Sequence, residues 1–297
     1  MHVRPLRAAA APLLGLVLVL TGGTASVAES PAPAPYVLDA PVVFAHRGAS
    51  AYAPENTLAA VDRAAALGVE WVENDVQRTK DGELVVMHDE TLARTTNVKE
   101  VFPDRSPWRV KDFTAAEIAG LDAGSWYSPA YAGTQVPTLR QFLDRLRVNG
   151  QRLLLEIKLP ELYPGIEVDV LRTLGRAGWL RPGYVDRRLV VQSFSADSVR
   201  TVHALRPDLT TALLGTPAVA DLGRYAAFTD RINPWYGGIT AEWVAAVHDL
   251  QGPHGRPLEV DAWTVDTAAA ARKVRDMGVD GLISNRPDLV RDAVAGY

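Results

Sequence analysis

Three acidic side chains stand in apolar, β-rich segments, where a charge is unusual. Glu73 and Asp75 are two positions apart, and residues two apart on a strand share a face, so both carboxylates are expected to point the same way. Glu156 follows a run of three leucines that is typical of a buried strand, and a buried acid requires a partner. The competing interpretation is that Glu73 and Asp75 are outward positions of a half-exposed strand.

Three carboxylates that meet at one place would either shift their pKa values or bind a cation. Like charges ~5 Å apart repel by roughly 3 kcal/mol per pair at an effective dielectric of ~20. The chain has no cysteine, so only oxygen and imidazole ligands are available. Because carboxylate oxygens prefer hard cations, the acids predict a divalent metal ion, Ca²⁺ or Mg²⁺, rather than zinc.

Basic side chains accompany the acids. His46 and Arg47 follow a predicted strand at 42–45, and the planar guanidinium of Arg47 suits a phosphate group. Lys158, two positions after Glu156, shares its face and adds a point charge. Three carboxylates, a divalent cation and these two basic residues would together leave a single positive charge. A phosphodiester monoanion would neutralise that charge.

A hairpin is expected to bring a second histidine to the acids. Asp81-Gly82, between two β-like runs, is typical of a two-residue turn. With that turn, Lys80 faces Glu83, and counting back along the strands places His88 directly across from Asp75. This register predicts that His88 shares a face with the two acids.

The elements that must position these residues alternate between β-rich runs and helical patterns, as in parallel strands joined by crossover helices. The repetition along the chain favours a closed (β/α)8 TIM barrel of the α/β class over an open sheet. Strands are predicted at 42–45, 70–77, 84–87, 153–157, 189–192, 210–214, 231–233, 258–264 and 281–284. Helices are predicted at 54–67, 139–147, 166–177, 196–205, 241–250 and 267–277. The strand at 84–87 is the extra, antiparallel one, because no helix fits before it.

One barrel domain is expected at residues 41–297, with a small insertion at about 91–135 that leaves the barrel after His88. The insertion carries six aromatic residues: Phe102, Trp108, Phe113, Trp126, Tyr127 and Tyr131. These rings either wall the substrate pocket or only pack the insertion onto the rim of the barrel. Trp263, near the end of a late strand, either lines the substrate site or fills the barrel.

The first residues have the pattern of a secretory signal. Two arginines precede an apolar run at 8–20, and small residues at 26–28 offer a cleavage site. We expect a signal peptide at 1–28 and a Pro/Ala-rich leader at 29–40. Since the apolar run is shorter than the ~20 residues of a membrane span, a secreted or extracytoplasmic protein without a stable membrane anchor is predicted. A retained anchor is the alternative.

Composition excludes several classes of partner and site. Thirty-one Lys and Arg against 35 Asp and Glu give a net charge of −4, so there is no basic surplus for binding nucleic acid. The absence of cysteine excludes disulfides, thiolate nucleophiles and Fe–S clusters. With 47% hydrophobic and 22% charged residues, the chain has the composition of an ordinary globular protein. A small-molecule substrate is the expected partner.

The motifs, taken in order, resemble those of the glycerophosphodiester phosphodiesterase family. They are His46-Arg47-Gly48, Pro54-Glu55-Asn56-Thr57, Glu73-Asn74-Asp75-Val76, Thr79-Lys80-Asp81-Gly82 with Val86-Met87-His88-Asp89, Leu155-Glu156-Ile157-Lys158, Gln192-Ser193-Phe194 and Trp263-Thr264-Val265. The resemblance spans residues 41–288. It implies a barrel with an insertion after the second histidine motif, and metal-dependent hydrolysis of glycerophosphodiesters, such as glycerophosphocholine, to glycerol 3-phosphate and an alcohol. In similar enzymes the substrate's own glycerol hydroxyl attacks phosphorus, and water then opens the cyclic phosphate.

The resemblance also implies roles for individual residues. It implies His46 and His88 as the acid–base pair, Glu73, Asp75 and Glu156 as metal ligands, Arg47 and Lys158 near the phosphate, and Gln192 and Trp263 in the substrate site. Either histidine could be the base. Asp266 and Asn285 depart from the family's usual residues; neither is an expected ligand, and both are expected to alter the pocket rim.

Two other functions fit part of the sequence. A phospholipase D-like enzyme of the same broad fold would act on a sphingolipid or lysolipid, and a non-catalytic secreted protein would only bind its ligand. The motif at 54–57 and the insertion count against the lipid enzyme. Retention of both histidines together with all three acids counts against the binding protein.

Overall fold

The protein is described by a computed structural model that covers residues 1–2 and 40–295. The segments predicted as signal peptide and leader lie, except for residues 1–2 and 40, outside this described part. Within the described part, no helix combines the length and the apolar character needed to cross a membrane.

Eight parallel strands in the described residues close into a barrel, because β1 pairs with both β2 and β9. Around the barrel the order is β1, β9, β8, β7, β6, β5, β4, β2, and β3 adds to β2 in the antiparallel direction. The strands are β1 (Val42–Ala45), β2 (Trp71–Arg78), β3 (Leu84–Val86), β4 (Arg152–Ile157), β5 (Leu189–Ser193), β6 (Thr210–Leu214), β7 (Arg231–Asn233), β8 (Glu259–Ala262) and β9 (Gly281–Ser284). The predicted TIM barrel and its extra antiparallel strand are confirmed.

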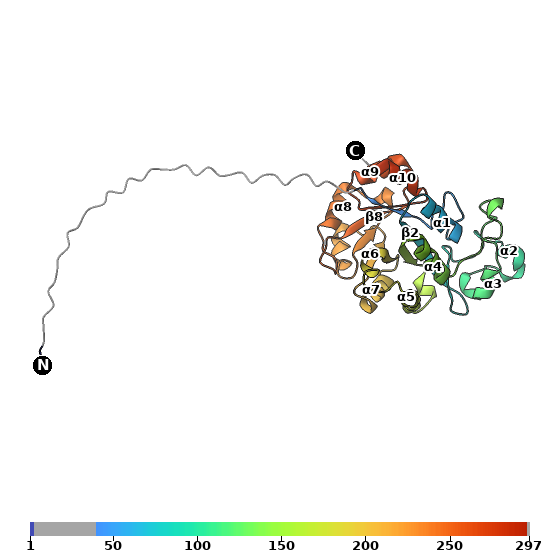
Figure 1. Ribbon diagram of the computed structural model, residues 1–297, viewed down its shortest axis with the longest axis horizontal. Coiled ribbons are helices and arrows are strands. Elements are labelled where there is room, and N and C mark those ends of the chain that lie inside the picture. The colour runs from blue at the N-terminus through green and yellow to red at the C-terminus, as the bar shows by residue number, and fades with distance from the viewer. Residues whose placement is uncertain (3–39, 296–297) are drawn as a thin grey trace. The chain divides into compact units, whose positions relative to one another are not determined.

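Helices cover the outside of the strands, as Figure 1 shows. The longer ones are α1 (Leu58–Ala66), α4 (Leu139–Asn149), α5 (Ile166–Arg176), α7 (Ala196–Leu205), α8 (Ala241–His248), α9 (Ala268–Arg275) and α10 (Pro287–Val294). Short helices are α2 (Val98–Val101), α3 (Ala115–Ala119) and α6 (Val185–Arg188). All six predicted helices are present. Helix α10 was not predicted, although a proline in the first helical turn is a common start signal.

The start of α1 differs from the prediction for a reason that bears on the site. A helix was predicted from residue 54, but it begins at Leu58 because Thr57 caps it: the Thr57 hydroxyl accepts a hydrogen bond from the Ala60 N–H group. The residues before the cap form a turn in which Asn56 has a φ of 58°, in the left-handed region. This turn directs the Asn56 amide at Asp75, to which its Nδ2 donates at 2.8 Å.

The predicted hairpin exists, but its predicted register is wrong by one residue. Val76 pairs with Val86, and the Met87 N–H group donates to the Asp75 carbonyl at 2.9 Å. Met87 rather than His88 therefore faces Asp75. Since β3 ends at Val86, His88 leaves the strand and reaches the acids from the loop that follows.

The register differs because the turn has three residues and not two. Thr79 and Glu83 close the loop with a main-chain hydrogen bond of 2.9 Å, which leaves residues 80–82 between them. Gly82 has a φ of 91°, a conformation that three-residue hairpin loops require at this position and that glycine adopts without strain. The Asp-Gly dipeptide is equally compatible with both loop lengths, so the sequence alone did not separate them.

The insertion between β3 and α4 has a small core of its own, beside the barrel in Figure 1. Phe102, Trp108 and Phe113 belong to this core or pack against it. Tyr127 and Tyr131 attach the insertion to the barrel, since their hydroxyl groups donate to main-chain carbonyl oxygens of residues 51 and 52, at 2.7 and 2.9 Å. These five rings stabilise the insertion and its attachment.

Candidate active site

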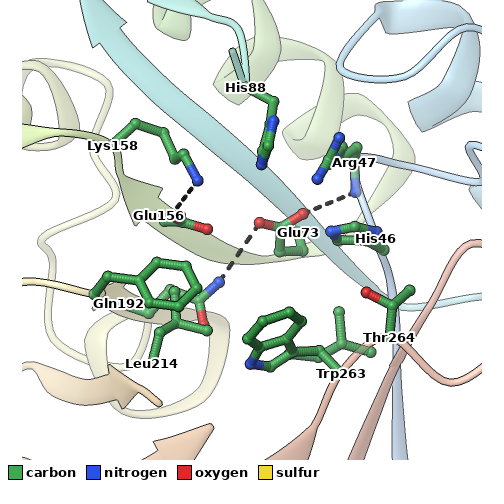
Figure 2. Close-up of a pocket in the computed structure, with 12 residues that line it drawn as sticks. His46, Arg47, Glu73, His88, Glu156, Lys158, Gln192, Leu214, Trp263 and Thr264 are labelled. Atoms are coloured by element: carbon green, nitrogen blue, oxygen red, sulfur yellow. Dashed lines mark hydrogen bonds and ion pairs between the residues drawn. The ribbon is translucent and has the colours of Figure 1, made fainter. Parts of the chain in front are cut away.

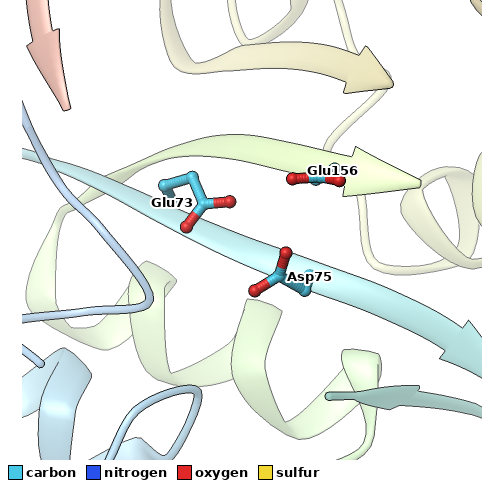
Figure 3. A group of neighbouring side chains, drawn as sticks. All are labelled: Glu73, Asp75 and Glu156. Carbon is cyan, nitrogen blue, oxygen red and sulfur yellow. The ribbon is translucent and has the colours of Figure 1, made fainter. Parts of the chain in front are cut away.

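The three predicted acids converge at the carboxyl end of the barrel. Glu73 and Asp75 lie on β2, and Glu156 lies on β4, in parallel register with Asp75. One carboxylate oxygen of each residue lies within 4.8 Å of the others (Figure 3). All three side chains are buried, at 1%, 0% and 6% exposure. The alternative of outward-facing positions on a half-exposed strand is therefore wrong.

The three acids have fewer hydrogen-bond donors than they need. Glu73 accepts from the Arg47 N–H group at 2.8 Å, but its second oxygen has only the Gln192 amide, at 3.5 Å. Among the described residues, Asp75 Oδ1 is buried without a hydrogen bond, and Glu156 Oε1 has only the Lys158 ammonium group, with Nζ at 2.7 Å. A buried oxygen without a hydrogen bond is rare in protein interiors unless a cation or water completes it.

The pKa values of the three acids have moved apart. Burial, together with repulsion from Asp75, raises the pKa of Glu73 well above its ordinary value and that of Glu156 to about 8. Burial opposes ionisation of Asp75 too, but the charges of Arg47, His88 and Lys158 outweigh it and lower the Asp75 pKa to about 2. The group therefore contains more acid than its surroundings can keep ionised. Hard oxygen donors in this state fit a divalent cation, which would take the place of the protons.

Arg47 connects the acids to the neighbouring loop. Its guanidinium donates to Glu55 at 2.8 Å, and Nε lies 3.5 Å from Asp75. Its backbone has a φ of 56°, and Gly48 follows it in close contact with α1, where an added Cβ would meet Ala60 at 2.6 Å. The loop after β1 can therefore approach α1 this closely only with glycine at position 48.

The His46 ring is held by Asn285 from the opposite end of the chain. Nδ1 lies 2.7 Å from Asn285 Oδ1, and the Asn285 amide nitrogen donates to Asp266 at 2.7 Å. That donation fixes the amide orientation, so His46 Nδ1 carries a proton and Nε2 remains the available atom. Burial and the charge of Arg47 lower the His46 pKa to about 4. Asn285 and Asp266, the two residues that depart from the family pattern, thus hold the ring of His46, a predicted catalytic residue.

The His88 ring has a carboxylate partner instead. Its Nδ1 lies 2.7 Å from Asp89, which also accepts from Arg94 at 2.6 Å. The same arginine donates two hydrogen bonds to Glu55, at 2.7 and 2.8 Å. Since Glu55 also binds Arg47, a chain of charged groups links the loop that carries His88 to the loop that carries Arg47.

These side chains surround a small pocket of about 80 Å³, shown in Figure 2. One side is polar and holds the predicted residues His46, Arg47, Glu73, His88, Glu156, Lys158 and Gln192. Lys158 Nζ lies 2.7 Å from Glu156. The other side is apolar, with Phe194, Leu214 and Trp263. Trp263 also packs on the apolar layer inside the barrel, so it fills the barrel and lines the pocket at the same time.

The six rings of the insertion do not line this pocket. The expectation that they wall it is wrong, because they pack within the insertion or onto the rim. The insertion instead contacts the site indirectly, because its Arg94 donates to Asp89, the partner of His88.

Comparisons with known proteins agree with this geometry. A sequence model of the glycerophosphoryl diester phosphodiesterase family matches residues 46–289. The chain belongs to this family. It is 35% identical over 270 residues to a glycerophosphodiester phosphodiesterase of Bacillus subtilis, a match that covers 86% of this chain and 87% of that protein. A glycerophosphodiester phosphodiesterase of Caldanaerobacter subterraneus is also 35% identical, over 256 residues, covering 85% and 97% of the two chains.

A solved structure of the same kind is a phosphodiesterase of Oleispira antarctica in complex with the product sn-glycerol-3-phosphate. It is 27% identical, has a TM-score of 0.74, and the match covers 86% of this chain and 98% of that chain. The assignment made from the motifs is confirmed, and with it the class of enzyme, a phosphoric diester hydrolase of this family.

Proposed function

We propose that this chain is a secreted enzyme that requires a divalent cation and hydrolyses glycerophosphodiesters, such as glycerophosphocholine, to glycerol 3-phosphate and an alcohol. The observation that carries the proposal is the convergence in one pocket of acids, basic side chains and two imidazole rings. The Oleispira antarctica relative binds sn-glycerol-3-phosphate, the product expected here.

Arg47 and Lys158 would bind the phosphate. Both line the pocket, on opposite sides of His88 in Figure 2. Each also faces a carboxylate, so neither charge is fully available until the acids are neutralised. A guanidinium can hold two phosphate oxygens at once, whereas the ammonium group adds a point charge.

His46 and His88 would move the protons. A phosphodiester has a poor alkoxide leaving group, so one residue must take the proton of the attacking hydroxyl and another must supply one to the leaving oxygen. In both rings Nδ1 is held by a partner, Asn285 or Asp89, and in the described residues no hydrogen bond involves Nε2. Nε2 is therefore the atom of each ring that would exchange a proton with the substrate.

Glu73, Asp75 and Glu156 would hold the cation. Their oxygens are close together, buried and short of donors. When bound, a divalent cation supplies Lewis-acid polarisation of phosphate oxygens and lowers the pKa of a bound hydroxyl. The carboxylates themselves would fix its position, since β2 and β4 are adjacent and hydrogen-bonded.

Release of glycerol 3-phosphate from glycerophosphocholine, with and without EDTA, tests the activity. We expect turnover that EDTA abolishes and that Ca²⁺ or Mg²⁺ restores, and turnover at least roughly 10²-fold lower by His46→Ala, which controls for contaminating enzymes. Lysophosphatidylcholine and sphingomyelin are the comparison substrates. Faster turnover of either lipid would favour the phospholipase D-like alternative, and binding without turnover of any substrate would favour the binding protein.

Secretion is supported by the sequence pattern of residues 1–28 and needs its own test. We expect expression of the full chain in a bacterial host to place the activity outside the cytoplasm, with a mature N-terminus after Ala28. Retention of the whole chain in the cytoplasm would contradict this part of the proposal without affecting the activity.

A further inference from the structure

An open polar depression of about 500 Å³ lies beside the small pocket. His46 and Arg47 line both cavities, so the two meet at these side chains. The other walls of the depression include Ser50, Asp266 and Arg286.

The two cavities differ in the way that the two halves of a glycerophosphodiester differ. The small pocket, about 80 Å³, lies over the acids and has one apolar side, which suits a three-carbon unit with its C–H groups. The depression is several times larger, open and polar. With phosphorus near His46 and Arg47, one substituent of the diester would enter each cavity. Since glycerol is common to all these substrates, the variable alcohol belongs in the depression.

The acidic side chains of the depression are already engaged. Asp266 accepts hydrogen bonds from the Ser284 hydroxyl at 3.1 Å and from the Asn285 N–H and amide groups at 2.8 and 2.7 Å. Glu55 accepts from Arg47 and Arg94. Neither carboxylate is therefore well placed to attract a cationic alcohol such as choline.

Arg286 is different. Its side chain is exposed, and in the described part of the chain its guanidinium takes part in no ion pair or hydrogen bond. Among the described charged side chains that line the depression, Arg286 is therefore the one whose donors are free for a ligand. An anionic group on the alcohol would pair with it without breaking an existing contact.

We propose that the depression binds the leaving alcohol and that Arg286 favours alcohols that carry an anionic group, a carboxylate or a phosphate. The inference rests on the proposed function and adds to it the chemical class of the preferred substrate.

Two pairs of substrates test the inference, because the members of each pair differ by the anionic group alone. Glycerophosphoserine and glycerophosphoethanolamine differ by a carboxylate, and glycerophosphoinositol 4-phosphate and glycerophosphoinositol differ by a phosphate. For each pair, kcat/KM of the substrate with the anionic group is divided by kcat/KM of the substrate without it, in the wild type and in Arg286→Gln. We expect Arg286→Gln to lower this ratio about tenfold for at least one pair. Arg286→Lys should keep part of the preference.

Arg176→Gln is the matched control. Arg176 is exposed, forms no ion pair within the described residues, and ends α5 at the opposite end of the barrel. It removes the same charge from the protein, so an equal fall of the ratio would overturn the inference in favour of a long-range field effect.

The outcomes separate the inference from the function on which it rests. Unchanged ratios for both pairs in an active, folded Arg286→Gln variant would overturn the inference and leave the proposed function standing. Absence of glycerol 3-phosphate from all four substrates would overturn the proposed function, and the inference with it. The responding pair identifies the anion.

Discussion

Acidic residues are buried at both ends of the barrel, but the two ends differ in how many hydrogen-bond and ion-pair partners these residues have. At the amino ends of the strands, Asp261 is fully buried, and Arg231 Nη1 lies 3.0 and 2.9 Å from its two oxygens. The neighbouring Asp280, which is only partly buried, accepts through Oδ2 from the Val260 N–H group at 2.7 Å and from His248 at 2.9 Å. At the carboxyl ends, Asp75 Oδ1 has no hydrogen bond in the described structure, and Glu156 Oε1 has only the Lys158 ammonium group.

This difference separates two uses of a buried carboxylate. Where a buried carboxylate has a cationic partner, removing that partner leaves an uncompensated charge, so the fold depends on keeping both members of the pair. Where carboxylate oxygens face one another with too few donors, the acids lower the free energy of unfolding until a ligand neutralises them. We infer that the amino end holds the barrel together and the carboxyl end is kept ready for a cation and an anionic substrate.

The largest expected effect is on catalysis at the carboxyl end. His46→Ala and His88→Ala should each lower kcat by roughly 10²–10⁴, because each removes one proton-transfer group. Cation affinity, measured by calorimetry, should barely change, since neither ring belongs to the acidic group. His203→Ala, on α7 and outside the pocket, is the control. If His88→Ala abolished cation binding and excess cation restored full activity, His88 would be a ligand and the two-histidine mechanism would be wrong.

The next effect is on stability at the amino end. Arg231→Met should lower the free energy of unfolding by about 3–5 kcal/mol, because Asp261 would remain buried without its cation. Urea unfolding measures this change. Adding Asp261→Leu should recover most of the loss, since no buried charge then remains.

Arg172→Met is the matched control for Arg231→Met, because Arg172 pairs with Asp169 on the exposed surface of α5. Its cost should stay within about 0.5 kcal/mol. A loss below about 1 kcal/mol for Arg231→Met would show that the fold does not depend on a cationic partner for Asp261, and the contrast between the two ends would fail.

Removing a buried charge at the carboxyl end should leave the stability of the cation-free protein unchanged or raise it. Glu73→Gln removes one of three mutually repelling carboxylates but keeps an oxygen that can accept from the Arg47 N–H group. The thermal midpoint of the cation-free protein should stay or rise, whereas cation affinity should fall by more than roughly tenfold. Glu156→Gln should behave alike. Unchanged cation affinity in both variants would disprove the metal assignment.

The sequence predicted the barrel and its acids because both rest on short-range patterns. Alternation of strands and helices gave the fold, and the spacing of Glu73 and Asp75 on one strand gave their common face. The turn after β2 was wrong by one residue because Asp-Gly occurs in loops of both lengths. The hydrogen-bond partner of a histidine can lie far away in the sequence: His46 and Asn285 are 239 positions apart. No local pattern encodes such a contact, although the unusual Asp266 and Asn285 did mark the place.

The smallest effect concerns a single ion pair at the amino end. A hydrogen bond to Asp280 raises the pKa of His248 above its ordinary value of 6.5, with burial opposing the shift. Because the folded state binds the proton more tightly than the unfolded state does, the pair stabilises the protein fully below pH 6.5. That contribution is lost as the pH rises through the folded-state pKa. His248→Gln keeps a donor for Asp280 and removes only the charge, so its cost should be a few tenths of a kcal/mol at pH 5.5 and close to zero at pH 8.5. Urea unfolding of the wild type and of His248→Gln at the two pH values gives the difference in the free energy of unfolding at each pH. Titrations of other groups are common to both proteins and cancel in this difference. An equal cost at both values would mean that the hydrogen bond, and not the charge, is what His248 contributes to this end of the barrel.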